Sequence, residues 1–300
     1  MNLPLIYSDE AAAARAEHRP LVALESTIIT HGLPRPRNLE VARAAEDEVR
    51  RAGATPATIA VMEGAIHVGL SDDRLERFAA TETAWKLSRA DLAVALAEGA
   101  TGATTVAATM ICAHLAGIEV FATGGIGGVH RGFAEDFDIS ADLEELARTP
   151  VTVVAAGAKA ILDLPKTLEA LETRGVPVIG YRTDEFPAFW ARSSGLEAPL
   201  RLDDPAQIAE TLRIRRALGL PGGQLIANPV PETDEIPWNT IAPIIDRAVA
   251  EAEVVGVHGK AVTPFLLERI WEATEGRSLE TNIALLLNNC RLAAEIAKAR

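Results

Sequence analysis

The sequence is poor in cysteine, in aromatic residues and in long apolar runs. Its 300 residues include two cysteines, Cys112 and Cys290, and 4% of the chain is aromatic. Two distant cysteines have the spacing of neither a zinc site nor a redox motif, so we expect both in the core of a protein from a reducing compartment. No stretch has the length of a membrane span, and residues 1–10 lack the basic and apolar regions of a signal peptide. These absences predict a cytoplasmic protein with no membrane partner.

Positive charge is also scarce. The chain has 29 lysine and arginine residues against 42 aspartate and glutamate residues, which gives a formal net charge of -13. Most of such a surface repels polyphosphate, so we expect no nucleic-acid partner and predict that any phosphorylated ligand is small and held locally. The composition, with 48% hydrophobic residues and a mean hydropathy of +0.13, is sufficient for a large core.

Short apolar runs alternate with amphipathic stretches along the chain. The predicted strands are residues 21–29, 57–62, 120–122, 151–155, 176–181 and 223–227. The predicted helices are residues 39–52, 88–98, 105–116, 141–148, 160–174, 205–218, 238–253, 264–274 and 278–297. This alternation predicts an α/β protein in which helices cover a largely parallel sheet. No linker divides the chain, so we expect residues 1–300 to form a single domain.

Lys159 stands at the end of the apolar run that begins at Val151. Burial disfavours a charged ammonium group, so a buried lysine is partly a neutral amine that can attack a carbonyl as a Schiff-base nucleophile. The alternative is a surface lysine on the first turn of a helix, with its stem lying on apolar neighbours.

Glu25 interrupts the apolar run 21–29. A carboxylate in a strand is costly unless it is paired or used, and a buried carboxyl group is suited to general acid catalysis. A structural carboxylate that caps loop amides or pairs with a buried base is the alternative. The turn-rich residues 30–38 follow, where open α/β sheets bind ligands, and His31 in this loop could simply satisfy backbone groups.

Two glycine-rich segments offer close approach to a ligand. Residues 98–106 present hydroxyls and amides before a helix, which suits an oxyanion or a phosphate, although the Gly-Lys-Ser/Thr of a P-loop is missing. Residues 123–131 fail the dinucleotide fingerprint, because His130 stands where its third glycine would be. A flexible turn is the alternative for this second segment.

Asp138 and Asp142 are two carboxylates four residues apart. If a helix begins at Ser140, that serine is its N-cap and Asp142 lies in the first turn, where the helix dipole favours it. Asp138 precedes the helix and could ligate a hard divalent ion, with water in the remaining positions. Lys86 could neutralise a substrate phosphate, or it could be solvated like most lysines.

Taken together, these segments resemble the pseudouridine-5'-phosphate glycosidase family. The similarity is carried, in chain order, by ALESTIITHGLP at 23–34, KLSR at 86–89, FATGGIGGVHR at 121–131, DISADL at 138–143, GAKAILD at 157–163, GYRTDEFPAF at 180–189, ANPVP at 227–231, GKAVTPF at 259–265 and NIAL at 282–285. They cover nearly the whole chain. We expect other residues in many relatives at Arg35, Asp136 and Arg182, and these departures are peripheral because none removes a chemical group.

The resemblance implies a fold and a set of site residues. The fold would be a three-layer α/β/α sandwich around a largely parallel or mixed sheet, commonly assembled as a homotrimer. Lys159 would be the nucleophile, Glu25 the proton donor and Asp138 the ligand of one Mn²⁺ per subunit, mostly through a water shell. The residues that contact the substrate would be Lys86, Thr105, Val106, His130, Ser140, Ala141, Asp142 and Asn282.

The implied reaction is the reversible cleavage of the C-glycosidic bond of pseudouridine 5'-phosphate to ribose 5-phosphate and uracil. It would pass through a Schiff base between Lys159 and the ring-opened ribose. Two alternatives stay open from the sequence. Another class I sugar-phosphate lyase or aldolase would share the lysine but use a different carbon nucleophile, and in a non-catalytic phosphosugar-binding protein Lys159 and Glu25 would be structural.

Overall fold

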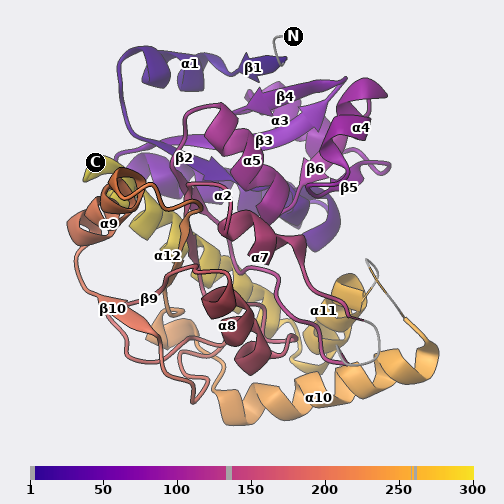
Figure 1. Cartoon of the computed structure of the whole chain (residues 1–300). Helices are drawn as coiled ribbons and strands as arrows, with labels where there is room; N and C mark the ends of the chain where they lie inside the picture. Colours follow the sequence, from indigo (N-terminus) through magenta and orange to yellow (C-terminus); the bar gives the residue numbers. More distant parts are fainter. Residues whose placement is uncertain (1–3, 133–136, 258, 260–261) are drawn as a thin grey trace.

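The computed structural model describes residues 4–132, 137–257, 259 and 262–300. In this part of the chain one sheet has the strand order β1-β4-β3-β2-β7-β8-β11-β9-β10, while β6 pairs with β3 and β5 pairs with β6. The strands are β1 (Leu5–Tyr7), β2 (Leu21–Leu24), β3 (Thr55–Met62), β4 (Ala65–Val68), β5 (Trp85–Leu87), β6 (Gly102–Thr104), β7 (Val120–Ala122), β8 (Thr152–Ala155), β9 (Val178–Tyr181), β10 (Leu200–Leu202) and β11 (Gln224–Ala227). The N-terminal strands therefore form one end of the sheet, and β9 and β10 form the other (Figure 1).

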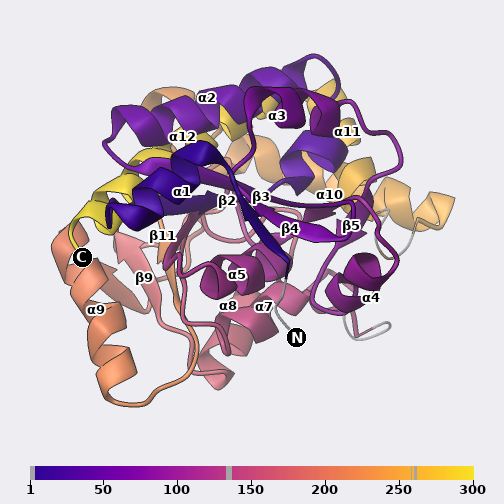
Figure 2. The same cartoon turned by 90° about the horizontal axis from the view of Figure 1, so that it is seen from above.

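Helices cover both faces of this sheet. They are α1 (Asp9–Ala16), α2 (Arg37–Arg51), α3 (Asp72–Ala79), α4 (Leu92–Ala97), α5 (Val106–Leu115), α7 (Ala141–Leu146), α8 (Leu164–Thr173), α9 (Pro205–Ala217), α10 (Trp238–Val255), α11 (Val262–Ala273) and α12 (Arg277–Lys298), with a π-helical turn η1 (Ile28–Gly32) and a 3-10 turn η2 (Glu232–Asp234). Figure 2 shows α2 and α12 over one face and α5, α7 and α8 under the other. The predicted three-layer sandwich is confirmed.

Most neighbouring strands run parallel, as predicted. Among the described strands, β3 is antiparallel to β4 and to β6, and the other pairs are parallel. Every residue of β3, β8 and β11 is buried. Strands covered on both faces have continuous apolar sequences, which is why the sequence shows runs without alternation.

The cysteines lie where the sequence analysis placed them. Cys112 in α5 and Cys290 in α12 are both fully buried and free. Burial raises the pKa of the Cys112 thiol to about 12, so this thiol stays protonated and unreactive in the folded protein at neutral pH.

The predicted strand 21–29 is wrong beyond Leu24. The chain leaves the sheet at Glu25 and forms the turn η1, while the Ser26 N–H donates to the Thr104 carbonyl at 3.4 Å. An apolar run of this length does not distinguish a buried strand from a buried helical turn, so the predicted strand is longer than the observed one.

The predicted helix 160–174 begins later than expected. Helix α8 starts at Leu164, because the Asp163 side chain accepts the Lys166 N–H at 3.1 Å and Pro165 occupies the first turn. Lys159 therefore lies in the loop between β8 and α8 and not on a helix. The short strands β1, β4, β5, β6 and β10 were not predicted, since three or four residues show no clear periodicity. The eight-residue helices α1 and α3 were also not predicted.

Among the described residues, no helix is both long enough and apolar enough to cross a membrane.

Candidate active site

The residues that the sequence analysis assigned to a site surround one pocket of about 400 Å³. The pocket lies beyond the carboxyl ends of β2, β7 and β8, since Glu25 follows β2, Gly124 follows β7 and Lys159 follows β8. Its lining includes all the predicted site residues: Glu25, Lys86, Thr105, Val106, His130, Asp138, Ser140, Ala141, Asp142, Lys159 and Asn282. The structure brings these residues together, and their individual roles stay predictions.

The half-buried Glu25 has one hydroxyl partner for each carboxylate oxygen. The Thr27 hydroxyl donates to Oε2, and the Thr123 hydroxyl, from the end of β7, donates to Oε1. These two side-chain hydrogen bonds hold the carboxylate in one orientation at the pocket wall. Sequence reasoning missed both threonines, although Thr27 stands two residues from Glu25.

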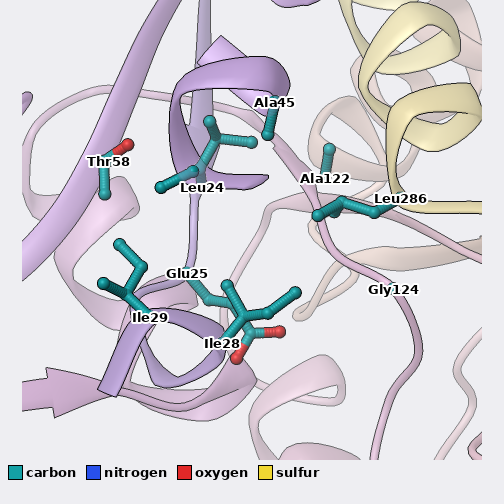
Figure 3. A pocket seen from close by; sticks show the side chains of 10 residues that line it. Leu24, Glu25, Ile28, Ile29, Ala45, Thr58, Ala122, Gly124 and Leu286 are labelled. Carbon is teal, nitrogen blue, oxygen red and sulfur yellow. The ribbon is translucent and has the colours of Figure 1, made fainter. Parts of the chain in front are cut away.

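A small void of about 20 Å³ lies behind Glu25 (Figure 3). Apart from Glu25 and Thr58, its lining is apolar or glycine: Leu24, Ile28, Ile29, Ala42, Ala45, Ala122, Gly124 and Leu286. The Thr58 hydroxyl already donates to Glu46 Oε1 at 2.6 Å. In Figure 3 the Glu25 carboxylate lies at the edge of this group, away from Thr58 and Ala45. The side of Glu25 that faces the sheet is therefore largely apolar.

The half-buried Lys159 is fixed through its backbone. Its N–H donates to the Ile126 carbonyl at 3.0 Å, and the Ile126 N–H donates to the Gly157 carbonyl at 3.1 Å. Gly157 has a φ of +81°, and a Cβ there would overlap the carbonyl oxygen of Pro187. The loop after β8 is thus bonded to the glycine-rich loop after β7, and the Lys159 side chain lines the pocket between them.

Asp142 is buried, and its carboxylate is engaged by the backbone. Oδ1 accepts the Ala107 N–H at 2.9 Å, and Oδ2 accepts the Gly127 N–H at 2.8 Å. A Cβ on Gly127 would lie 2.8 Å from Oδ2, so the close approach requires glycine. Ser140 caps α7 as predicted, and its hydroxyl accepts the Asp142 N–H. Asp142 therefore ties α7 to the N-terminus of α5 and to the glycine loop.

Groups suited to an anion lie at the start of α5, next to the Ala107 amide that Asp142 binds. Thr105 is the N-cap of α5, its hydroxyl accepts the Ala108 N–H at 3.4 Å, and Val106 is the first helical residue. The half-buried Lys86 comes from β5 and lines the same pocket. A helix N-terminus beside an ammonium group favours a phosphate.

His31 lies at the rim of the pocket, in η1. Partial desolvation of the ring, followed by the positive charge of Lys86, lowers its pKa, while a hydrogen bond with the backbone of Ala84 opposes this shift. His31 Nδ1 is 2.6 Å from the Thr30 hydroxyl. The ring therefore favours its neutral form.

Asp138 and His130 lie close together in the lining of the pocket. His130 Nδ1 lies 3.9 Å from Asp138 Oδ2, and the His130 N–H donates to the Asp138 carbonyl at 3.0 Å. Within the described residues, no cluster of three or more His, Cys, Asp or Glu side chains could hold a metal ion. One carboxylate on an open pocket fits a hard ion that keeps most of its water shell, and not a cage made of protein ligands.

Asn282, from α12, carries the clearest sign of a missing partner. It lines the pocket, and its Oδ1 is buried with no hydrogen-bond partner among the described atoms. Buried amide oxygens are nearly always hydrogen-bonded, so this atom is typical of a group that a ligand satisfies. Further lining residues that sequence reasoning did not assign include Ser88 and Phe189.

Two of the three peripheral departures have local contacts. Arg35 Nε donates to the Ala79 carbonyl at 3.0 Å, and the Arg182 guanidinium lies 4.8 Å from the centre of the Tyr181 ring. Neither belongs to the lining of the pocket described above. Asp136 lies outside the described residues.

Sequence comparisons identify relatives over the full chain. The family described as indigoidine synthase A like protein matches residues 10–299. The chain is 68% identical over 299 residues to a pseudouridine-5'-phosphate glycosidase of Paracoccus denitrificans (strain Pd 1222), covering 99% of this chain and 98% of that protein. It is 65% identical over 298 residues to a pseudouridine-5'-phosphate glycosidase of Roseobacter denitrificans (strain ATCC 33942 / OCh 114), covering 99% and 96%.

Structure comparisons agree with the sequence comparisons. A prealnumycin C-glycosynthase, solved in complex with ribulose 5-phosphate, matches with a TM-score of 0.92 and 42% identity over 100% of this chain and 97% of that chain. An indigoidine synthase A-like protein of Thermotoga maritima matches with a TM-score of 0.89 and 37% identity, covering 99% and 97%. The predicted family is confirmed: this chain belongs to the pseudouridine-5'-phosphate glycosidase (indigoidine synthase A-like) family.

Proposed function

We propose that this enzyme reversibly converts pseudouridine 5'-phosphate and water into ribose 5-phosphate and uracil. The observation that carries the proposal is that Glu25 and Lys159 line one pocket with Lys86 and the N-terminus of α5. These groups supply a proton donor, an amine and an anion site within one cavity. The glycosidases that are 65–68% identical over nearly the whole chain support the same substrate.

The bond to be cleaved explains the need for a lysine. In pseudouridine, C1' of the ribose is joined to C5 of uracil, so the leaving group is a carbon atom. An ordinary glycosidase protonates a leaving oxygen with one carboxyl group and uses a second as nucleophile or base. That device is inadequate for a carbon leaving group, whereas an amine can turn C1' into an iminium centre.

Cleavage proceeds in three steps. Glu25 gives a proton to the ring oxygen as the C1'–O bond breaks toward that oxygen, and the Lys159 amine forms a bond to C1'. The bonded nitrogen then loses a proton to the Glu25 carboxylate, and its lone pair forms an iminium while the C1'–C5 electron pair returns to C5, which takes this proton from Glu25 and leaves with uracil. Water adds to the iminium and gives a proton to the Glu25 carboxylate, and collapse of the adduct restores the Lys159 amine, reprotonates Glu25 and releases ribose 5-phosphate. Synthesis is the reverse, with uracil C5 attacking the iminium.

The remaining pocket groups orient the phosphate and the base. Lys86 and the Val106 amide would hold the phosphate, and the residues from Ser140 to Asp142, together with Thr105, His130 and Asn282, would contact the substrate. Such positioning lowers a barrier by an amount on the order of several kcal/mol. A local cationic wall also explains how an acidic protein binds a phosphorylated nucleoside.

Asp138 would hold Mn²⁺, one ion per subunit, with water completing its shell. When bound, the ion supplies positive charge near the anionic substrate. We also propose a homotrimer in the cytoplasm as the working form.

Uracil release from pseudouridine 5'-phosphate tests the activity, and borohydride reduction in the presence of ribose 5-phosphate tests the intermediate. We expect a reduced sugar adduct on Lys159 by peptide mapping, and none in Lys159→Ala. An active enzyme without an adduct at Lys159 would contradict the nucleophile. The same assay after dialysis against a chelator tests the metal, because full activity without added Mn²⁺ would contradict the role of Asp138.

A second candidate is another class I lyase or aldolase on a sugar phosphate. The observation that favours it is the 42% identical C-glycosynthase solved with ribulose 5-phosphate. It would use the same lysine with a different carbon nucleophile. An adduct on Lys159 without uracil release would select this candidate.

A further inference from the structure

We infer that Thr123 is a positioning residue for the proton donor Glu25, and that Asn289 holds Thr123 in place. The inference rests on the proposed function and adds residues that the proposed reaction does not use directly. Thr123 follows β7 and is fully buried, and its hydroxyl donates to Glu25 Oε1. It lies 98 residues from Glu25 in sequence, so the contact depends on the packing of β2 against β7.

Hydroxyl partners suit a carboxyl group that gains and loses a proton. An ionised carboxylate accepts at both oxygens, whereas a protonated carboxyl group donates from one of them. A threonine hydroxyl can donate or accept, so it stays bonded to Glu25 on either side of the proton transfer. A backbone N–H can only donate and would lose its bond when the oxygen is protonated.

The two threonines hold Glu25 in different ways. Thr27 is half-buried and lies two residues along the same loop as Glu25, so its hydroxyl adds no bond to another element. Thr123 is anchored to the sheet, because its N–H donates to the Val154 carbonyl of β8 at 3.0 Å. Thr123 therefore fixes Glu25 relative to β8, the strand that leads to Lys159.

A buried amide chain clamps the other side of Thr123. Asn289 Nδ2 donates to the Thr123 carbonyl at 2.8 Å, and Asn289 Oδ1 accepts from Asn228 Nδ2 at 2.9 Å. The Asn228 N–H donates to the Ala155 carbonyl at 2.8 Å. Asn289 is fully buried and Asn228 is 5% exposed. These bonds join the ends of β7, β8 and β11 to α12 and fix the Thr123 backbone from both directions.

The void behind Glu25 offers little to replace the Thr123 hydroxyl. Its lining is apolar or glycine except for Glu25 and Thr58 (Figure 3). A buried water usually makes about three hydrogen bonds, and a water placed here would find two side-chain partners at most. Loss of the hydroxyl therefore leaves Oε1 without its fixed partner.

The test compares uracil release by three variants. Thr123→Val keeps the shape and deletes the hydroxyl, so we expect kcat to fall about 10- to 100-fold while KM stays within about threefold. Thr123→Ser restores the hydroxyl and should recover kcat to within about fivefold of the wild type. Thr149→Val is the matched control, because the buried Thr149 hydroxyl donates to Glu145 Oε1 outside the pocket lining, and its kcat should stay within about twofold.

The outcomes separate this inference from the proposed function. If the wild type releases uracil and Thr123→Val keeps its kcat, the inference alone is wrong. Equal losses in Thr123→Val and Thr123→Ser also overturn it, because packing and not the hydroxyl would then matter. If the wild type releases no uracil, the proposed function fails and the inference fails with it. Should Thr123→Val not fold, Thr27→Val probes the hydroxyl pair from the half-buried loop, with a smaller loss of kcat expected and an unchanged kcat contradicting the pair.

Discussion

Glu25 and Asp142 are two carboxylates of one pocket with opposite kinds of partner. Each has one hydrogen-bond donor per oxygen. Glu25 receives side-chain hydroxyls from Thr27 and Thr123, whereas Asp142 receives the backbone N–H groups of Ala107 and Gly127.

The difference shows which carboxylate is suited to proton transfer. A fixed N–H only donates, so a proton on Asp142 would remove one of its bonds and loosen the start of α5. A hydroxyl can rotate to donate or to accept, so Glu25 can exchange a proton without losing its hydrogen bonds. Residue type alone would not have separated the two acids. Asp142 is a structural bracket of the site, and Glu25 is the candidate acid.

The largest effect should come from Glu25→Gln. The amide keeps the size of the side chain but cannot give up a proton in this role, so we expect kcat for uracil release to fall about 10²- to 10⁴-fold. Thermal unfolding should change by no more than about 3 °C. A near-normal kcat in this variant would show that Glu25 is not the proton donor, and the proposed difference between Glu25 and Asp142 would be wrong.

Asp142→Asn should act mainly on stability. Its NH₂ group would face a backbone N–H, so a buried donor would lose its acceptor, at a cost of about 2–4 kcal/mol. We expect the midpoint of thermal unfolding to fall by about 5–10 °C. Calorimetry of the two variants side by side is the measurement. An unchanged midpoint in Asp142→Asn, together with a kcat loss as large as that of Glu25→Gln, would reverse the two assignments.

The smallest effect concerns His31 at the rim. The pKa of His31 is lowered in the folded state, so below about pH 6.5 the unfolded chain binds more protons than the folded chain. The protein therefore loses stability as the pH falls from about 6.5 toward the lowered pKa. His31→Gln should remove this loss. Between pH 7.5 and pH 5 its unfolding midpoint should therefore drop less than that of the wild type, by up to about 2 °C. An equal drop in both proteins would show that His31 does not contribute.

The sequence predicted which residues line the site better than it predicted the hydrogen bonds between them. Glu25, Gly124 and Lys159 follow parallel strands that end at the same edge of the sheet, so motifs far apart along the chain meet there. The partners of Glu25 could not be predicted, because Thr123 reaches it only through the pairing of β2 with β7.

The errors in the predicted elements have a similar origin. The predicted strand 21–29 is too long because the apolar sequence continues into η1, whereas the pairing of β2 ends at Leu24. The bonds of Asp142 could not be predicted either, because its carboxylate oxygens accept the backbone N–H groups of residues 107 and 127. Backbone amides leave no pattern in the sequence. Long-range backbone contacts decide both points.

The two buried cysteines can be used to measure local unfolding of the helices that contain them. Both thiols lie in the core, so a thiol reagent can modify Cys112 in α5 or Cys290 in α12 only after the surrounding helix has separated from the sheet. Cys112 reports on the helix whose first turn borders the pocket, and Cys290 reports on the helix that carries Asn282 and Asn289. Their relative labelling rates would show, without any substitution, whether the phosphate side or the α12 side of the site opens first.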